Sequence, residues 1–152
     1  GTGTLGGTRR KQRRISYILR EEAGRHRSGV NSLCLSGRGD VLYTASRDGT
    51  ARGWSTSSPR SRSAKVYDGH TDWVNDCVLL GNETTLVTGS SDTSIMVWNT
   101  QTQECVNTLC LHTDYVKALA CAKHKGFVAS AGLDRDVYLW DIEASKQPIS
   151  QG

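Results

Sequence analysis

Long hydrophobic runs are absent from this 152-residue sequence. No apolar stretch approaches the roughly 18 residues that a transmembrane helix needs. The amino terminus, Gly1 to Gly7 followed by Thr8, Arg9 and Arg10, has no apolar segment of the kind found in secretory signal peptides. We therefore expect no membrane insertion and no secretion. Because the chain begins without Met, we also expect it to be cut from a longer polypeptide.

Paired cysteine motifs and phosphate-binding motifs are missing as well. The five cysteines are odd in number and none forms a C-x-x-C pair, so they fit neither a disulfide framework nor a zinc site. This usage is typical of a reducing compartment, and we expect the cytoplasm and the nucleus. The phosphate-binding patterns G-x-x-x-x-G-K-[ST] and G-x-G-x-x-G do not occur, and we expect no cofactor.

Positive charge is concentrated at one end of the chain. The formal net charge is +4, but residues 1–27 hold eight Lys and Arg against two Glu, so the remainder is slightly acidic. The basic run consists of Arg9, Arg10, Lys11, Arg13 and Arg14. Such a run fits contact with nucleic-acid phosphates or a nuclear address, and a solvated arm is the alternative. Nucleic-acid binding through this arm is therefore our secondary hypothesis.

A repeat is the strongest signal in the sequence. Three segments align when Trp54, Trp98 and Trp140 are superposed, and each tryptophan has a His 28 residues before it and an Asp six residues before it. The matching residues are His26 and Asp48, His70 and Asp92, and His112 and Asp134. The tryptophan spacings of 44 and 42 residues fall in the range of four-stranded propeller blades.

Each repeat unit alternates apolar and polar residues in short runs bounded by Gly, Asn, Asp and Ser, and helix signals are nearly absent. We predict an all-β fold, an incomplete arc of about three four-stranded blades. The expected strands are Val30–Leu35, Val41–Ala45, Thr50–Trp54, Ala64–Tyr67, Val74–Leu80, Thr85–Gly89, Ser94–Trp98, Cys105–Leu109, Val116–Cys121, Phe127–Ala131 and Val137–Trp140.

The rest of the chain is divided around these units. We expect a flexible basic arm at residues 1–14, and a lone strand, Ile15–Arg20, with a linker at 15–27. The three blades are expected at residues 28–69, 70–111 and 112–152, the third of them incomplete. Because propellers need about four to eight blades to close a ring, we expect further blades elsewhere in the polypeptide.

Three segments resemble the WD-repeat family of β-propellers. They are Asp68–Val74, Thr88–Asp92 and the dipeptide Trp140-Asp141. Trp54 and Trp98 depart from the family pattern, because Ser and Asn follow them in place of Asp. The resemblance implies a structural brace in each blade, in which the Asp of a tight turn accepts a hydrogen bond from the His and links hydroxyl and indole donors into a closed polar network.

A catalytic role for the same residues is the alternative. His70 and Asp92 with Thr88 or Ser90 contain the residue types of a hydrolase triad. A nucleophilic site needs one activated hydroxyl in a unique pocket, whereas this set recurs in every unit, and we predict that the chain is not an enzyme. The hydroxyl of the brace is either the residue four before the Asp (Thr44, Thr88, Ser130) or the residue two before it (Ser46, Ser90, Gly132). One His per blade is also too dispersed to hold a metal ion.

Candidate partner-binding residues follow from blade geometry. Residues three and five after each His, and the residue before each Asp, are expected at the mouth of the central channel. The candidates are Asn31, Arg47, Trp73, Asn75, Ser91, Tyr115, Lys117 and Leu133. Exposed Trp and Tyr beside Lys and Arg are typical of binding hot spots. The alternative is that Trp73 and Tyr115 pack on neighbouring blades.

A closer resemblance exists to one group within the family. Segments Arg14–Arg20, His70–Asp76, His112–Ala120 and Val128–Leu133 are similar to the N-terminal blades of WD-repeat proteins that activate ubiquitin-specific proteases. This implies a non-catalytic scaffold that binds a deubiquitinase and raises its activity, with a link to DNA repair. The resemblance places the main protease contacts on later blades, so we do not expect this piece alone to activate a protease. A generic WD-repeat scaffold is the alternative.

Overall fold

Short alternating segments of the sequence fold into β-strands throughout the described part of the chain. The computed structural model describes residues 1, 3, 6–7, 17, 24–57 and 64–144. Within these residues the chain forms eleven strands and no α-helix. The prediction of an all-β fold is confirmed. No helix among the described residues is long and apolar enough to span a bilayer.

The strands form three antiparallel sheets that follow one another along the chain. The first sheet contains β1 (Val30–Leu35), β2 (Val41–Ser46), β3 (Thr50–Ser55) and β4 (Lys65–Asp68). The second contains β5 (Val74–Leu79), β6 (Thr85–Ser90), β7 (Ile95–Asn99) and β8 (Cys105–Leu109). The third contains β9 (Val116–Ala122), β10 (Phe127–Gly132) and β11 (Val137–Asp141). Every expected strand in these sheets is present, with ends within one residue of the prediction.

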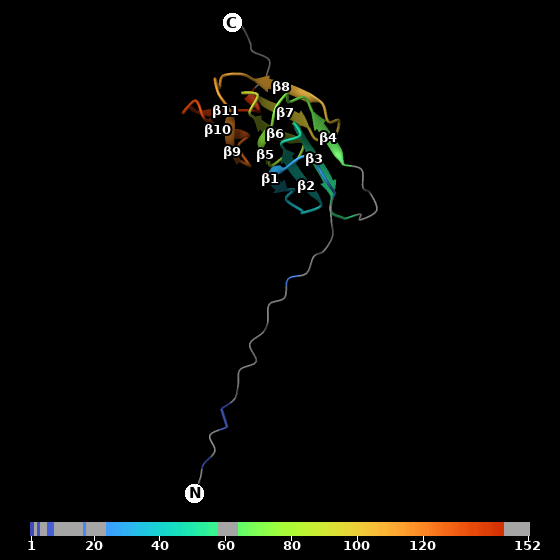
Figure 1. Ribbon diagram of the computed structural model, residues 1–152, viewed down its shortest axis with the longest axis vertical. Coiled ribbons are helices and arrows are strands. Elements are labelled where there is room, and N and C mark those ends of the chain that lie inside the picture. Colours follow the sequence, from blue (N-terminus) through green and yellow to red (C-terminus); the bar gives the residue numbers. More distant parts are fainter. Residues whose placement is uncertain (2, 4–5, 8–16, 18–23, 58–63, 145–152) are drawn as a thin grey trace.

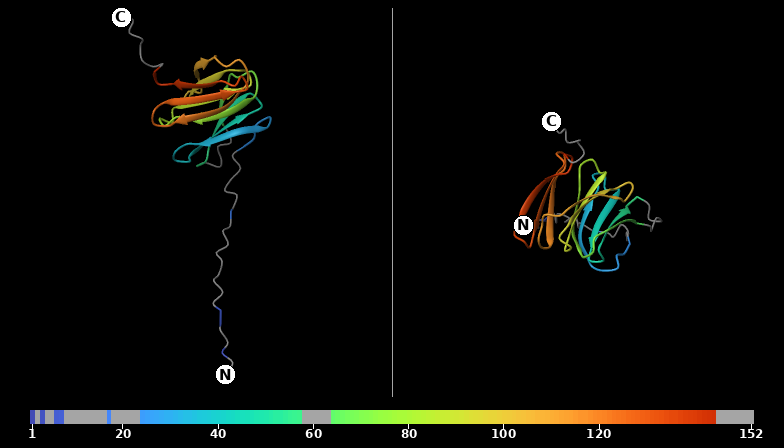
Figure 2. Two further views of the ribbon diagram at one scale, coloured as in Figure 1. Left: turned by 90° about the vertical axis from the view of Figure 1, so that its left-hand side faces the viewer. Right: turned by 90° about the horizontal axis from the view of Figure 1, so that it is seen from above.

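The three sheets stand side by side as successive blades (Figures 1 and 2). The first strand of each sheet, β1, β5 and β9, packs beside its counterpart in the neighbouring sheet. We refer to the three sheets as blades 1, 2 and 3. The lone strand expected at Ile15–Arg20 lies outside the described residues, apart from Tyr17.

The hydrophobic core lies in the two seams between blades. One cluster joins blades 1 and 2, and its large members are Tyr43, Tyr67, Val74, Leu86 and Trp98. The other joins blades 2 and 3 and contains Leu80, Val87, Ile95, Val97, Val116, Val128 and Ile142. Every residue of β6 is buried, because β6 belongs to the middle blade, which has a neighbour on each side. Contact with a neighbouring blade on each side explains why both faces of β6 are buried.

The outer blades expose apolar side chains where no further blade covers them. On β1, Leu33 and Leu35 are 62% and 54% exposed. On β11, Val137 and Leu139 are 74% and 72% exposed. The three blades therefore form an open arc, as predicted.

Tight turns join the second and third strands of each blade. The residue after the Asp of each repeat has a positive φ: Gly49 at 84°, Thr93 at 78° and Arg135 at 71°. Glycine adopts this left-handed conformation without steric cost, whereas threonine and arginine do not. In all three turns the Asp carboxylate accepts the N–H two residues on, at 2.8–3.1 Å. That hydrogen bond holds the turn in place and aims the second carboxylate oxygen at the histidine.

Candidate functional site

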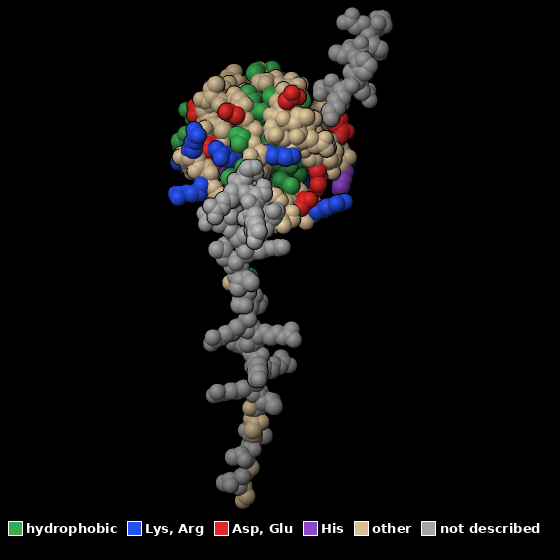
Figure 3. All heavy atoms as spheres, turned by 90° about the vertical axis from the view of Figure 1, so that its right-hand side faces the viewer, with side chains coloured by type: hydrophobic (Ala, Val, Ile, Leu, Met, Phe, Trp, Pro, Cys, Tyr) green, Lys and Arg blue, Asp and Glu red, His purple; other side chains and the backbone are tan. Residues whose placement is uncertain are grey.

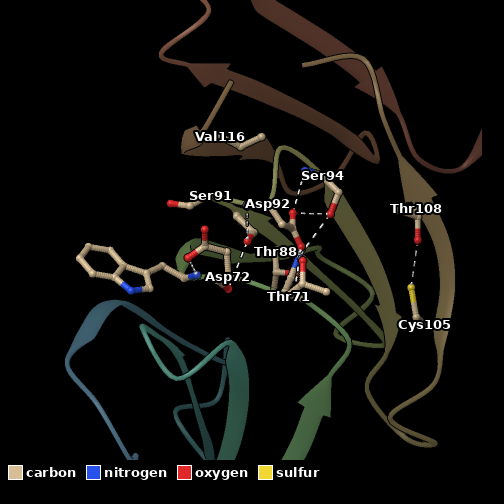
Figure 4. Close-up of polar contacts among 12 residues, drawn as sticks. Thr71, Asp72, Thr88, Ser91, Asp92, Ser94, Cys105, Thr108 and Val116 are labelled. Carbon is tan, nitrogen blue, oxygen red and sulfur yellow. Dashed lines mark hydrogen bonds and ion pairs between the residues drawn. The ribbon is translucent and has the colours of Figure 1, made fainter. Parts of the chain in front are cut away.

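The middle blade contains a closed chain of polar contacts. His70 Nδ1 lies 2.7 Å from Asp92 Oδ2, and His70 Nε2 lies 2.7 Å from Thr88 Oγ1. The indole Nε1–H of Trp98 donates to the same Thr88 oxygen at 2.9 Å. Figure 4 shows Asp92 and Thr88 together beside Thr71 and Ser94. The Thr71 N–H and the Ser94 hydroxyl each donate to the Asp92 carboxylate.

The same network occurs in the other two blades. His26 contacts Asp48 at 2.8 Å and Thr44, and Trp54 donates to Thr44 at 2.9 Å. In blade 3, His112 contacts Asp134 at 2.7 Å and Ser130 at 2.8 Å, and Trp140 donates to Ser130 at 2.8 Å. All nine residues named from the repeat therefore lie in three equivalent networks.

The structure settles which hydroxyl takes part. In each blade it is the residue four before the Asp, namely Thr44, Thr88 or Ser130. The hydroxyl of the residue two positions before the Asp has a different role in blades 1 and 2. Ser46 and Ser90 accept the backbone N–H of Asp48 and Asp92, which closes the turn. Gly132 occupies this position in blade 3, so that hydroxyl contact has no equivalent there.

Proton donors and acceptors match along the network when the histidine is neutral. An ionised Asp92 accepts the Nδ1 proton, which leaves Nε2 as the acceptor for the Thr88 hydroxyl. Burial lowers the pKa of His70 and outweighs the opposing effect of Asp92, which favours the neutral ring. Burial alone would raise the pKa of Asp92, but hydrogen bonds from Ser94 and His70 hold it below its usual value.

A triad-like arrangement with no access to substrate cannot act as a nucleophilic site. Thr88 is fully buried and Ser130 is 1% exposed, so no substrate carbonyl can reach either hydroxyl. The Thr88 oxygen also accepts an indole hydrogen bond that a nucleophile would have to release. Among the described residues, no group of three His, Cys, Asp or Glu side chains is arranged to hold a metal ion. The networks of blades 2 and 3 therefore brace their blades, and blade 1 repeats the same contacts around Thr44, which is 7% exposed.

Acid is expected to weaken the middle brace. Because burial lowers the pKa of His70 below the ordinary 6.5, the unfolded chain binds more protons than the folded chain between the lowered value and 6.5. The contribution of His70 to stability is complete above this window and is lost as the pH falls through it. Urea unfolding at about pH 7.5 and 5.5 measures this loss. His70→Gln should reduce the pH dependence, with His124→Gln, an exposed imidazole, as the control; an unchanged dependence in His70→Gln would contradict the assignment.

The channel-mouth candidates divide into exposed and buried members. Trp73, Tyr115 and Leu133 are 42%, 44% and 54% exposed. The Arg47 guanidinium lies 4.2 Å from the centre of the Trp73 ring, in a cation–π contact between blades 1 and 2. Leu133 N–H donates to the Tyr115 carbonyl at 2.9 Å, which places these two residues side by side. Lys117 is also exposed.

The asparagines and the serine among these candidates bond to neighbouring residues instead. Asn31 donates to the Val74 carbonyl of the next blade at 3.1 Å. Asn75, which stands at the equivalent position of blade 2, donates to the Val116 carbonyl at 2.8 Å and to Ser91 at 2.9 Å. Asn75 and Ser91 are buried. Each asparagine thus ties its blade to the following one. Asn31 remains exposed and also accepts a hydrogen bond from Arg47 at 3.1 Å, so the buried Asn75 and Ser91 are the candidates that cannot meet a partner without rearrangement.

One functional residue was not identified from the sequence. The carboxylate of Asp76, on β5, accepts the Ser32 hydroxyl of blade 1 at 2.6 Å and the backbone N–H of Leu119 in blade 3 at 2.8 Å. It also accepts the N–H of Cys77 at 2.9 Å. Asp76 thus joins the first strands of all three blades. The signal available in the sequence was a single charged residue inside an otherwise mostly apolar strand.

The basic arm, Arg9, Arg10, Lys11, Arg13 and Arg14, lies outside the described residues. On the face shown in Figure 3, the Lys and Arg side chains of the described residues lie interspersed with Asp and Glu side chains. This described face therefore presents mixed charge, and the nucleic-acid hypothesis continues to rest on the arm alone.

Comparisons with known proteins agree with the observed fold. The family model described as "WD domain, G-beta repeat" matches residues 21–55, 61–99 and 103–141. The solved structure of U3-55K is similar with a TM-score of 0.72 and 21% identity, over 78% of this chain and 38% of that one. The crystal structure of the RRP9 WD40 repeats gives 0.72 and 22%, over 78% and 37%. The chain thus spans under two fifths of either structure, and at this identity the likeness concerns the fold. Because the three matched segments cover most of the sequence, the chain belongs to the WD40 repeat family, whose domains mediate protein interactions.

Proposed function

We propose that this chain is a non-catalytic scaffold that binds a ubiquitin-specific protease and takes part in activating it. The choice of protease rests on sequence: segments His70–Asp76 and His112–Ala120 resemble the N-terminal blades of WD repeat-containing protein 48, an activator of these deubiquitinases. The observation that carries an interaction role is the half-exposed Trp73, beside Arg47, on a rim that also presents Tyr115 and Leu133. The proposed setting is the cytoplasm and nucleus, with a link to DNA repair.

The proposed mechanism is a shift in the conformational equilibrium of the protease. A scaffold raises activity only if it binds the active conformation more tightly than the inactive one. A tenfold rise in activity corresponds to a difference in binding free energy of about 1.4 kcal/mol between the two conformations. The buried and hydrogen-bonded seams between blades favour this mechanism, because rearrangement of the scaffold on binding would reduce that difference in binding free energy.

Direct binding to purified catalytic domains of ubiquitin-specific proteases tests the proposal. We expect the chain to bind at least one of them through the rim of blades 2 and 3, a contact in addition to the main ones that the resemblance places on later blades. The Trp73→Ala, Tyr115→Ala double variant should bind at least tenfold more weakly, because aromatic residues dominate binding hot spots. Val106→Ser is the matched control, since Val106 is 58% exposed but lies on the outermost strand of blade 2. Equal losses in both variants would argue against the proposed surface.

Activation is measured separately, as the rate at which the protease releases a fluorophore from ubiquitin. Because the arc of three blades is open, we expect the rate to rise with a polypeptide in which the propeller is closed, and binding to be the readout for this chain. Failure of both polypeptides to bind any ubiquitin-specific protease would remove the specific proposal and leave a scaffold for other proteins.

A further inference from the structure

Two cysteines face each other across the seam between blades 1 and 2. Cys34 lies on β1 and Cys77 on β5, and their sulfur atoms are 3.9 Å apart. Both are free thiols. A disulfide bond is about 2.05 Å long, so the two sulfurs need to approach by about 2 Å to form one. The pair is therefore placed for a bond between blades that neither blade can form alone.

The equivalent place in the next seam holds no sulfur. Cys34 stands eight residues after its repeat histidine, as Val78 does in blade 2, and Cys77 stands seven residues after its own, as Leu119 does in blade 3. Val78 and Leu119 both pack against the second core cluster. Since an apolar pair fills this position between blades 2 and 3, packing alone does not require two thiols between blades 1 and 2.

The two thiols have different surroundings. Cys34 is half-buried, whereas Cys77 is 2% exposed. A hydrogen bond from Cys77 lowers the pKa of Cys34 against the effects of burial and of the Asp76 carboxylate, and the Lys123 ammonium lowers it further. Donating that hydrogen bond, together with burial, raises the pKa of Cys77 well above its usual value. Because the thiolate is the reactive form, Cys34 is the nucleophile of the pair and Cys77 the second, resolving thiol.

We propose that Cys34 and Cys77 form a reversible oxidation site, with hydrogen peroxide as the oxidant. The Cys34 thiolate attacks one peroxide oxygen, the O–O bond breaks, and Cys34 becomes a sulfenic acid while the departing hydroxide takes a proton to form water. Cys77 then loses its proton and attacks the Cys34 sulfur. The S–O bond breaks, the S–S bond forms, and the second hydroxide leaves as water with that proton. The two thiols thereby reduce one peroxide to two waters.

The disulfide would connect blades 1 and 2 beside the middle brace, because Cys77 pairs in register with Thr88 on β6. A covalent link between residues far apart in sequence restricts the unfolded chain and raises stability. In a reducing compartment such a bond is transient and typical of redox sensing. Oxidation would thus stiffen the seam between blades 1 and 2, and thiol reductants would reverse this change.

Peptide mapping tests the proposal on the full 152-residue chain with Cys105→Ser and Cys110→Ser, which remove the two exposed cysteines. Trypsin places the remaining three in separate peptides: Cys34 in residues 28–38, Cys77 in 66–117 and Cys121 in 118–123. After hydrogen peroxide, alkylation and digestion without reductant, we expect peptide 28–38 joined to peptide 66–117, two hydrogens lighter than the pair. Dithiothreitol should separate them. The oxidised chain should unfold at a higher temperature than the reduced chain.

Three variants in the same background assign the roles. With Cys77→Ser, the sulfenic acid at Cys34 should persist and react with dimedone, and with Cys34→Ser, oxidation of Cys77 should be at least tenfold slower. The double variant Cys34→Val, Cys77→Leu copies the residue types at the equivalent positions of the next seam and should fold without the cross-link. The proposal is overturned if the folded parent forms no cross-link, if Cys34 joins Cys121 instead, or if Cys77 oxidises as fast without Cys34.

Discussion

Replacing Thr88 with valine is expected to lower the free energy of unfolding by about 2–5 kcal/mol. Valine keeps the size and branching of threonine but removes the hydroxyl that His70 and Trp98 share. Two buried polar groups, the imidazole Nε2 and the indole N–H, then lose their partner, and each such loss costs about 1–3 kcal/mol. Because Thr88 is fully buried, no water replaces the hydroxyl without displacing core atoms. Urea unfolding followed by tryptophan fluorescence measures the change.

The chain itself supplies the control for this variant. In blade 3 a serine, Ser130, makes the same two contacts that Thr88 makes in blade 2. Thr88→Ser therefore keeps the network and should cost only about 1 kcal/mol, for the lost methyl group. If the serine and valine variants lose equal stability, the brace contributes packing rather than hydrogen bonding, and the interpretation of the repeat given above is wrong.

The fold could be predicted from the repeat because the spacing of its residues is visible within each short stretch of sequence. A fixed distance between His, Asp and Trp, with period-two alternation between them, leads to hairpins of known length, and all eleven strands were located from it. The choice of hydroxyl was not predictable in the same way. Thr88 and Ser90 are two residues apart on β6, so alternation places both on one face of the strand. The repeat favours Thr88, because Gly132 leaves the other position without a hydroxyl in blade 3, and the positions of His70 and Trp98 settle the choice.

For a related reason, sequence patterns could not predict the contacts between blades. Asn31 and Asn75 donate to carbonyl groups more than 40 residues away, and any backbone carbonyl in the chain offers the same acceptor. The approach of Cys34 to Cys77 depends in the same way on how β1 packs against β5. The sequence indicated the asparagines as candidate partner contacts at the channel mouth, and the structure adds that their side chains donate to the next blade.

These contacts indicate how the arc keeps its shape. Each blade is braced internally by His, Asp and Trp, and blades 1 and 2 are tied to the following blade by Asn31 and Asn75 at equivalent positions. The exposed Trp73 and Tyr115 stand next to these ties, two residues before Asn75 and Lys117. A rigid seam fixes the spacing between neighbouring aromatic side chains, which lowers the entropy cost of binding a partner.

Replacing Asp76 with alanine is expected to lower the free energy of unfolding by about 3–5 kcal/mol, because the carboxylate joins all three blades. Hydrogen bonds to a charged acceptor contribute about 1.5–3 kcal/mol each. The two that cross between blades, from Ser32 and Leu119, account for the expected loss, because the third comes from the adjacent residue Cys77. The backbone N–H groups of Cys77 and Leu119 then have no carboxylate acceptor. Backbone donors between packed strands cannot be rotated toward another partner, so their loss is not compensated locally. Urea unfolding measures the total effect.

Amide hydrogen exchange distinguishes the loss of the Asp76 hydrogen bonds from a general loosening of the seam. The Leu119 amide donates to Asp76 across the seam between blades 2 and 3, so its exchange in Asp76→Ala should accelerate by more than the overall loss of stability explains. Ser32→Ala, which removes only the donor from blade 1, should cost about 1.5–3 kcal/mol and leave the Leu119 amide protected. Unchanged protection of Leu119 in the alanine variant would show that the Asp76 carboxylate does not hold the seam between blades 2 and 3.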